Sequence, residues 1–564
     1  MIFDLSKLQH ARLPEYDLCI VGSGAAGMTL ANELLDQGLR ICVLESGKLK
    51  PTKQADALRK VHSEGIHIKD HSRERVLGGA STTWGGLSNL LDSVDMKPRP
   101  FVRYSGWPIF RDELLSYYEQ AAERYRFAPP HLFESYLDVA KWKGDIQPSW
   151  NELEEKIFLA TSNPLNFGKQ FKHIFAKPEV DLYLDATLIR LEGDGQKCRI
   201  AWGVVRTSKG HSYQLKSRIF VLATGGIENA RILLNSRDIC PHGLGNEQDQ
   251  VGRYLMNHPK NCYGVIRLRH ALRELPYYFG CVYQGYSGYA GLKLKESVQE
   301  ERGCLSSYVR FEPLFSWSGN PGVTALVFLG KRNRRFFQMW KACRLEKIVP
   351  LRDYSETGDD SEIHIRDYSE TGEDSELQSR PKSARDWLRV LGVILLNMPQ
   401  VVKYLYYRLY GATPEITAIR LRNFMEMAPH PENRVILGDE KDAYDQPIPV
   451  VRLQTTELDR HSLIALHRTL AEEIARNGLG ELTSNLHNEE IWPIDRDASH
   501  HLGATRMGEN PRSSVVNPDC RLHTVENVYV AGGSVFPTSA CSNPTFTIVA
   551  LSIRLAQHLK KNVY

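Results

Sequence analysis

The chain has 564 residues, with 71 Lys and Arg against 67 Asp and Glu, so its formal net charge is only +4. That balance excludes a basic surface built for nucleic acid and an acidic solvating chain, and 42% hydrophobic residues exclude a mostly disordered chain. A chain of this length exceeds the roughly 250–300 residues at which a single core stops growing, so we expect two or more domains.

The amino-terminal sequence MIFDLSKLQHARLPEYD lacks a positive head followed by a long apolar core, so it does not resemble a secretory signal. No uninterrupted run of about 18 apolar residues occurs, and we expect no ordinary transmembrane helix. The ten cysteines contain no C-x-x-C pair, so we expect neither a metal site nor a disulfide framework. These features favour a reduced, cytoplasmic location.

Residues 16–47 predict a nucleotide-binding strand–helix–strand unit. Two short apolar runs, at 18–21 and 41–44, are typical of buried parallel strands. Helix formers fill residues 25–35 between them. The turn that joins the first run to this helix carries the pattern G-x-G-x-x-G, which in this context indicates a dinucleotide site.

The glycines of that turn each have a physical reason. Gly22 permits the tight turn, Gly24 lets the backbone approach a pyrophosphate, and Gly27 allows helix and strand to pack closely. The helix start offers free N–H groups to the phosphates, and Glu45, at the end of the second run, is placed to accept bonds from the adenosine ribose. FAD and NAD both satisfy this pattern, and a glycine-rich turn in an ordinary α/β domain is the alternative.

Residues 77–89, LGGASTTWGGLSN, form a second glycine-rich segment. Such a stretch cannot build a core, but its backbone can lie against a flat ligand, because glycine leaves no side chain in the way. The bulky Trp84 favours a buried, ligand-facing turn over an ordinary surface loop. Arg73 and Arg75 precede the segment as candidates for binding phosphate or structural carboxylates.

Residues 528–531 are a third strand-like apolar run, again followed by two glycines, Gly532 and Gly533. The sequence Ser-Asn-Pro-Thr at 542–545 then leads into an apolar, helix-like run, and proline is favourable in a first helical turn. The N–H groups of that helix start would face an anionic group, such as the pyrimidine edge of a reduced flavin.

With these motifs in place, the sequence resembles the glucose–methanol–choline (GMC) flavoprotein oxidoreductases. The matching pieces follow in order along nearly the whole chain, and only about 300–420 shows no clear match. They are the nucleotide motif at 20–47, LGGASTTWGG at 77–86, SGWPIFRDELLSYYEQAAERY at 105–125, VLATGGIENARILL at 221–234, VGRYLMNHP at 251–259, PENRVILGDEKDAYDQPIPVVRL at 431–453 and the carboxy-terminal block.

The resemblance implies an α/β fold in which a discontinuous Rossmann-like FAD-binding domain is joined to an α+β substrate domain with an antiparallel sheet. The segment 431–453 would supply strands for a sheet floor under the substrate. The expected boundaries are 1–100, 180–260 and 490–564 for the FAD-binding domain, and 101–179 and 261–489 for the substrate domain.

The resemblance also implies oxidation of an alcohol to a carbonyl by hydride transfer to flavin N5, with a catalytic His followed by a second His or an Asn. The H-x-x-G spacing to Gly503 places the first at His500, and Asn543 occupies the second position. This His/Asn pairing is similar to that of pyranose oxidase, cellobiose dehydrogenase and bacterial sugar or polyol dehydrogenases. His501 is expected to point to the other side and to support structure or substrate.

These residue types suit the chemistry. Imidazole is the side chain best able to take an alcohol proton at neutral pH, which makes His500 the expected base. Asn543 cannot take a proton, but its amide can hold the alkoxide oxygen and fix its angle to the flavin. The alternative is that His500 and His501 are merely packed histidines.

Thr83 occupies the place where some sugar-oxidising members carry a histidine bonded to the flavin, so we expect FAD without a covalent link. The expected FAD contacts come from the glycine turns, the 77–89 loop, the middle of the chain and the carboxy-terminal block. They are Gly22, Gly24, Ala25, Ala26, Gly27, Glu45, Ser46, Gly78, Gly79, Ser81, Thr82, Trp84, Gly85, Gly86, Asn89, Leu188, Thr224, Gly225, Gly226, Gly533, Ser534, Asn543, Pro544 and Thr545.

Two segments fall outside the resemblance. RDYSETGDDSEIHI at 352–365 recurs as RDYSETGEDSELQS at 366–379, and we expect an exposed, mobile acidic insert rather than an acidic lip for a cationic aminosugar. Residues 384–410 are apolar with Arg, Lys and five aromatics, and we expect a helical pair packed over the substrate domain or in a subunit contact. A peripheral membrane patch, with lipid-linked glycans as substrates, is the alternative that we do not favour.

The sequence therefore predicts an FAD-dependent dehydrogenase of a sugar, glycoside or polyol, whose partners are a small-molecule alcohol and an electron acceptor but no nucleic acid. An O₂-using oxidase of the same family is the main alternative, and a non-catalytic flavin-binding protein is the alternative from another class. An NAD-dependent dehydrogenase would lack the 77–89 loop and the carboxy-terminal block. The substrate, the acceptor and the oligomeric state stay open.

Overall fold

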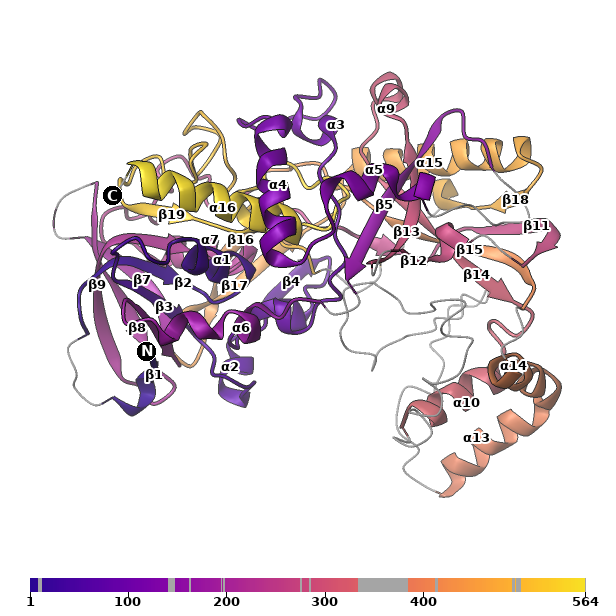
Figure 1. Cartoon of the computed structure of the whole chain (residues 1–564), viewed down its shortest axis with the longest axis horizontal. Coiled ribbons are helices and arrows are strands. Elements are labelled where there is room, and N and C mark those ends of the chain that lie inside the picture. Colours follow the sequence, from indigo (N-terminus) through magenta and orange to yellow (C-terminus); the bar gives the residue numbers. More distant parts are fainter. Residues whose placement is uncertain are drawn as a thin grey trace.

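Three β-sheets organise the part of the chain that the computed structural model describes (Figure 1). The acidic duplication at 352–379 lies outside the described residues, so its predicted exposure stays a prediction. The described residues are all except 9–12, 140–147, 162–163, 194, 196–197, 274–275, 284–285, 333–383, 411–413, 489–491, 493, 495–498 and 563–564.

The first sheet is mostly parallel and contains the strand–helix–strand unit predicted from the sequence. Its strand order is β1-β6-β3-β2-β9-β8-β7, and β19 pairs with β9. Only β8 pairs antiparallel, with β9 and β7; the other neighbours run parallel. The strands are β1 (Ile2–Asp4), β2 (Tyr16–Val21), β3 (Ile41–Glu45), β6 (Val180–Leu184), β7 (Thr187–Gly193), β8 (Ile200–Arg206), β9 (Ser212–Leu222) and β19 (Val528–Val530).

Helices from distant parts of the chain stack on one another beside this sheet. Helix α16 packs between α1 and α4. Phe546, at the start of α16, stacks on Phe127 with ring centroids 4.4 Å apart and meets Tyr118 edge-on at 4.8 Å. The helices around the first sheet are α1 (Ala25–Glu33), α2 (Lys53–Ala57), α3 (Ser93–Met96), α4 (Arg111–Tyr125), α6 (Phe167–Gln170), α7 (Gly226–Asn235) and α16 (Thr545–Asn562).

The second sheet is antiparallel, with strand order β12-β13-β14-β15-β11-β18, to which β5 and β10 are added. Leu463, Leu466 and Leu470 of the long helix α15 share a buried core with strand residues of this sheet. The fold class predicted from the sequence is therefore confirmed. The elements are β5 (Leu153–Thr161), β10 (Lys260–Asn261), β11 (Val265–Leu272), β12 (Cys281–Tyr283), β13 (Tyr286–Leu294), β14 (Tyr308–Phe315), β15 (Ile416–Phe424), β18 (Gly480–Thr483), α5 (Pro130–Val139), α8 (Pro276–Phe279), α9 (Glu296–Arg302) and α15 (Glu457–Arg476).

The third sheet corrects one expectation. The predicted hairpin at 431–453 forms β16 (Arg434–Lys441) and β17 (Pro447–Leu453), which pair with β4 (His62–Gly65) in the order β16-β17-β4. The hairpin is thus separate from the antiparallel sheet, where the substrate floor was expected. The backbone of β17 pairs with β4, and Arg231 of α7 holds the hairpin there, because its guanidinium pairs with Asp442 at 2.6 Å and donates to the carbonyl of Pro447 at 2.9 Å.

Each large sheet takes its strands from several segments. The strands of the first sheet lie at 2–45, 180–222 and 528–530, and those of the second at 153–161 and 260–483. The two sheets are therefore connected repeatedly through the chain. The exact domain boundaries that we expect from the sequence stay a prediction.

A small helical unit lies at one end of the second sheet, at the lower right of Figure 1. It consists of α10 (Pro321–Arg332), α13 (Ala384–Leu396) and α14 (Met398–Tyr410). No described helix is long and apolar enough to cross a membrane alone, but 387–396 and 398–407, bent by 81°, pass that length and composition test as a pair. The expected helical pair is therefore present, and α14 contacts Trp317, which follows β14 of the second sheet.

Candidate active site

A cavity of about 290 Å³ lies at the carboxyl ends of β2, β9 and β19. Ligands of open α/β sheets bind at this edge. Residues from the two glycine-rich segments and the carboxy-terminal block meet here. The predicted site residues that line it are Gly22, Gly24, Ala25, Ala26, Glu45, Ser46, Gly79, Ser81, Trp84, Gly85, Gly86, Leu188, Thr224, Gly225, Gly226, His500, His501, Gly533, Asn543, Pro544 and Thr545.

The turn after β2 has the geometry of a phosphate-binding turn. Gly24 lies just before α1 without a side-chain cap, so the first N–H groups of the helix face the cavity end of the turn. A Cβ on Gly24 would have no atom within 4 Å, whereas one on Gly27 would lie 1.9 Å from the carbonyl oxygen of Gly22. Gly24 therefore keeps space open, and Gly27 allows the helix to pack on the turn.

Glu45 ends β3 and is held by the same turn. Its carboxylate accepts bonds from Ser23 Oγ at 2.5 Å and from the backbone N–H of Gly47 at 2.7 Å. Burial raises the pKa of Glu45, although these bonds and the charge of Arg75 oppose the shift. The carboxylate lines the cavity at the position expected to bind a ribose.

Arg73 and Arg75 form ion pairs with a structural carboxylate, that of Glu228. Their guanidinium groups lie 2.7 and 3.0 Å from Glu228 Oε2, and Arg231 pairs with the same carboxylate at 3.0 Å. Burial alone would raise the pKa of Glu228, but the guanidinium groups of Arg75, Arg231 and Arg73 hold it far below its ordinary value. This cluster joins the segment before the 77–89 loop to the first turn of α7.

The 77–89 loop presents mainly backbone to the cavity. Trp84 anchors it, because the indole N–H donates to the carbonyl of Leu165 at 2.9 Å and the ring packs edge-on against Phe127. Ser81 Oγ donates to the carbonyl of Gly78 at 2.6 Å and accepts from the N–H of Phe167. The anchored loop supports the expectation of a ligand-facing turn.

Five predicted contacts lie behind the cavity lining. Gly27 packs against Gly22, and the N–H of Gly78 donates to Ser23 Oγ at 3.1 Å. Of the other three, Thr82 makes a bond within its own loop, and Asn89 and Ser534 join distant segments. Thr82 Oγ1 donates to the carbonyl of Gly79, Asn89 Nδ2 donates to the carbonyl of Ile157, and Ser534 Oγ accepts from Asn229 Nδ2.

His500 is held by two neighbouring residues that we did not assign from the sequence. Its backbone N–H donates to Asn257 Oδ1 at 2.9 Å, and its Nδ1 lies 2.7 Å from Nδ1 of His258. The two rings are almost perpendicular, at 87°. His258 is 3% exposed, and its Nε2 lies 3.1 Å from the carbonyl oxygen of Ser539.

When His258 and His500 are both neutral, these hydrogen bonds determine which ring nitrogen of each carries the proton. The carbonyl of Ser539 can only accept, so Nε2 of His258 carries the proton and its Nδ1 is an acceptor. His500 then donates from Nδ1 to His258, which leaves the basic lone pair of His500 on Nε2. The arrangement therefore prepares one nitrogen of a cavity-lining imidazole for proton transfer.

His501 also lines the cavity, with its Nε2 3.4 Å from Ser72 Oγ. Its main chain is tightly packed, since a Cβ on Gly226 would lie 2.2 Å from the carbonyl oxygen of His501. His501 thus joins the carboxy-terminal block to α7 and to the segment before the 77–89 loop.

Sequence reasoning missed His258, Asn257 and Asn229. The first two lie in the matched block VGRYLMNHP, where two polar residues between apolar neighbours were the available signal. Asn229, in VLATGGIENARILL, is fully buried; its Oδ1 accepts from Thr224, and its Nδ2 donates to Ala531 and Ser534. It joins the ends of β9 and β19 under the cavity.

The cavity fits an adenine dinucleotide with a flat ring system. Gly24, Gly225 and Gly532, at the ends of three parallel strands, each face open space, since a Cβ on any of them would have no atom within 4 Å. Helices α1, α7 and α16 begin near this edge and supply N–H donors for anionic groups. Glu45 also lines the cavity and is the residue expected to accept bonds from a ribose. Among the described residues, no group of His, Cys, Asp and Glu could hold a metal ion.

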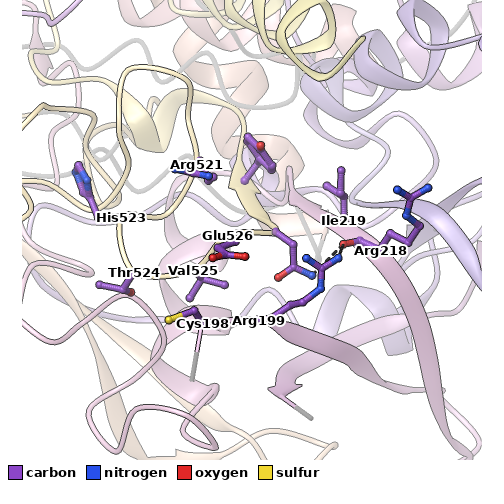
Figure 2. A pocket seen from close by; sticks show the side chains of 11 residues that line it. Cys198, Arg199, Arg218, Ile219, Arg521, His523, Thr524, Val525 and Glu526 are labelled. Atoms are coloured by element: carbon purple, nitrogen blue, oxygen red, sulfur yellow. Dashed lines mark hydrogen bonds between the residues drawn. The ribbon is translucent and has the colours of Figure 1, made fainter. Parts of the chain in front are cut away.

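A second cavity, of about 510 Å³, is lined by Arg199, Arg218 and Arg521 (Figure 2). It also includes residues 523–527, which precede β19, so it lies away from the carboxyl edge of the sheet. None of the predicted site residues lines it. We therefore take the cavity that contains His500 and Asn543 as the candidate active site.

The fold and this cavity have the features of a dinucleotide-binding α/β protein. A family model described as GMC oxidoreductase matches residues 429–552. Residues 429–552 therefore match the carboxy-terminal domain of the GMC oxidoreductases, the family that the resemblance predicted, and enzymes of this family bind FAD.

Similar proteins agree with this assignment. The fructose dehydrogenase large subunit of Gluconobacter japonicus is 25% identical over 61% of this chain, but the match covers only 47% of that relative. The 6'''-hydroxyparomomycin C oxidase of Streptomyces lividus is 21% identical over 96% of this chain and 92% of its own length. A structure of formate oxidase from Aspergillus oryzae RIB40 has the same fold, with a TM-score of 0.53, 15% identity and coverage of 98% of this chain and 100% of its own.

Proposed function

We propose that this protein oxidises an alcohol group of a sugar, glycoside or polyol to a carbonyl with FAD as its cofactor. The observation that carries the proposal is that His500, held at Nδ1 by His258, and Asn543 line the same cavity as the nucleotide-binding turn at Gly24. A base and an amide donor beside a dinucleotide cradle are the parts that alcohol oxidation requires.

Each residue has a defined role in the proposed reaction. Nε2 of His500 takes the proton of the substrate hydroxyl, while the adjacent C–H bond breaks and its two electrons leave with the hydrogen as hydride. The amide of Asn543 donates a hydrogen bond to the oxygen as negative charge develops on it. Bound FAD supplies the hydride acceptor at N5. His501 is a supporting residue that positions the segment before the 77–89 loop through Ser72.

The substrate class is supported by the similar proteins. The names of the two relatives described above specify fructose and an aminoglycoside, both of which carry several sugar hydroxyl groups. We propose a dehydrogenase that passes electrons to a quinone, a cytochrome or another acceptor. An O₂-using oxidase is the second candidate, because the relatives include both types. Turnover with O₂ against turnover with a quinone or dye acceptor decides between them.

We propose that FAD is bound without a covalent link. Thr83 lines the cavity, its hydroxyl donates to the carbonyl of Ala80 at 3.3 Å, and a hydroxyl cannot form the histidyl bond of some relatives. Acid precipitation should release the yellow chromophore into the supernatant. Chromophore that stays with the precipitated protein would contradict this part of the proposal.

The main test is anaerobic reduction of the bound flavin by a panel of sugars, aminosugars, glycosides and aliphatic alcohols. We expect sugar-type alcohols to bleach the flavin and His500→Ala to lower the reduction rate by roughly 10²–10⁴-fold while FAD stays bound. Near-normal reduction of the His500→Ala protein would refute the base assignment. A flavin that no alcohol reduces would favour a non-catalytic flavin-binding protein instead.

A further inference from the structure

Most of the exposed large apolar side chains that the structure describes lie in one place, on α13 and α14. We call these residues the outer apolar face. On α13, residues 388, 391 and 395 follow one helical stripe, and on α14, residues 398, 402 and 406 follow another. Leu388, Leu395 and Leu396 are 69, 67 and 86% exposed. The face consists of Trp387, Leu388, Leu391, Leu395, Leu396, Met398, Val402 and Tyr406.

The opposite side of the same two helices is already packed. Val390, Val401 and Tyr404 are buried, and the ring of Tyr404 meets Trp317 edge-on at 5.8 Å. The bend between the helices is also anchored, because Asn397 Oδ1 accepts from Asn320 Nδ2 at 2.9 Å. The helices are thus apolar on both sides, and a helix that is apolar all round is normally buried on all sides. The outer apolar face therefore requires a partner.

The charged residues from Trp387 to Tyr410 have one sign, and Asp386, directly before Trp387, is the one acidic residue in the sequences of α13 and α14. Residues 387–410 contain Arg389, Lys403 and Arg408 and no Asp or Glu, and residues 321–332 of α10 contain no acidic residue either. Arg389 and Lys403 are exposed. Trp387 and Tyr406 add the aromatic types that favour the boundary between lipid and water.

We infer that α13 and α14 dock the protein on the surface of an anionic lipid bilayer. Each helix has 13 residues, or about 20 Å of length, and the 81° bend prevents the pair from forming one straight span. Both stripes can therefore lie in the interface with their leucines among the acyl chains and their basic residues at anionic headgroups. A second copy is a poorer occupant, because pairing this face with itself would bring basic residues together.

Co-sedimentation of the full-length protein with vesicles tests this inference. We expect binding to vesicles of phosphatidylcholine and phosphatidylglycerol, and weaker binding to phosphatidylcholine alone or at high salt. The double variant Leu395→Glu, Val402→Glu should weaken binding by roughly 100-fold or more, because it replaces two exposed apolar anchors with charges. Arg389→Gln with Lys403→Gln should weaken it roughly tenfold and only on anionic vesicles.

Phe110→Glu is the matched control, because Phe110 is 81% exposed but lies at the start of α4, away from this face. It should bind vesicles like the wild type. All variants should keep the wild-type melting temperature and flavin reduction by a soluble substrate. Wild-type protein that stays in the supernatant with anionic vesicles would overturn the inference, whether the face is covered by a second copy or by another part of this chain. Equal loss of binding in Phe110→Glu would overturn it as well.

Discussion

The Nδ1 atoms of His258 and His500 lie 2.7 Å apart, and the other ring nitrogen of His258 lies 3.1 Å from the carbonyl oxygen of Ser539. Ser539 precedes Asn543 by four residues in the same turn. The turn that presents the amide of Asn543 to the cavity therefore also determines, through His258, which nitrogen of His500 is basic. The two catalytic candidates are linked through one buried imidazole.

The first prediction concerns His258 as a positioning residue. In His258→Leu, His500 loses the acceptor at its Nδ1, so its ring can rotate and carry the proton on the wrong nitrogen. We expect the rate of anaerobic flavin reduction to fall roughly 10–100-fold. The acid limb of the pH–rate profile should also move to lower pH, because the imidazolium form of His500 loses a hydrogen-bond acceptor.

His258→Asn is the matched variant, since an Asn Oδ1 can lie close to the position of a His Nδ1. It should recover most of the lost rate and restore the pH profile, which a purely structural role would not explain. Stopped-flow absorbance across a pH series measures both quantities. An unchanged rate and profile in His258→Leu would contradict the linked arrangement.

The second prediction concerns Asn543. Loss of an amide donor to the developing alkoxide should lower the reduction rate by roughly 10²–10³-fold in Asn543→Ala, with FAD content unchanged. The maximal reduction rate should change more than the substrate concentration at half saturation, because the hydrogen bond from Asn543 strengthens as charge develops on the substrate oxygen. Ser542→Ala is the control: the neighbouring hydroxyl donates to the carbonyl of Leu90 at 2.8 Å, away from the cavity lining. A loss confined to substrate binding would count against the assigned role.

The third prediction separates cofactor binding from folding in the nucleotide turn. Gly24 faces open space and has a φ of −70°, which any residue can adopt, so the Gly24→Val protein should fold normally. Its side chain should occupy the space expected for the pyrophosphate, so the protein should purify without FAD. Gly27→Val should lower the melting temperature or fail to fold, because its first side-chain atom would overlap the carbonyl of Gly22. Circular dichroism and the visible flavin spectrum measure the two effects. A yellow Gly24→Val protein would show that the cofactor lies elsewhere.

The fourth prediction concerns stability at acid pH. Burial lowers the pKa of His467 to about 3, and its ring partners, Ser484 and Asn423, are both neutral. An unfolded histidine has a pKa of about 6.5, so the unfolded state binds a proton that the folded state rejects as pH falls from about 6.5 towards 3. His467 should therefore destabilise the fold progressively over that range, by up to about 1.4 kcal/mol for each pH unit.

Melting temperatures between pH 7.5 and pH 4.5 test this effect. His467→Gln should lose stability at neutral pH but show a shallower decline in acid than the wild type. His461→Gln, on the exposed side of the same helix, should keep the wild-type slope. Parallel curves for the wild type and His467→Gln would disprove the contribution.

Short local patterns in the sequence predicted much of the structure. The glycine turn predicted β2, α1 and β3 because tight turns, buried strands and a helix start each leave a short sequence signal. The fold class is confirmed, and residues 429–552 match the predicted family, while the roles of His500 and Asn543 stay predictions that their shared cavity supports. His258 could not be assigned, because its role depends on a contact with a residue 242 positions away.

The hairpin at 431–453 and the residues behind the cavity show a second limit. An alternating strand pattern predicts β16 and β17 but does not say which sheet they join, and the parallel pairing of β17 with β4, almost 400 residues earlier, determines that. Asn89 illustrates the same problem, because a small polar residue in a glycine-rich loop can bind a ligand or form a hydrogen bond within the protein, and Asn89 does the latter with Ile157. Composition alone cannot distinguish these cases.

The residues after β19 and at the start of α16 complete the cavity lining. The first part of that lining follows β2, which is synthesised more than 500 residues earlier. A growing polypeptide should therefore not retain a flavin before β19 and the start of α16 have been synthesised. Ribosome-bound fragments that stop before Gly532 should be colourless even when their amino-terminal sheet has formed. Cofactor supply in the cell would then act on chains that already include α16, and a bound cofactor should protect this helix against proteolysis.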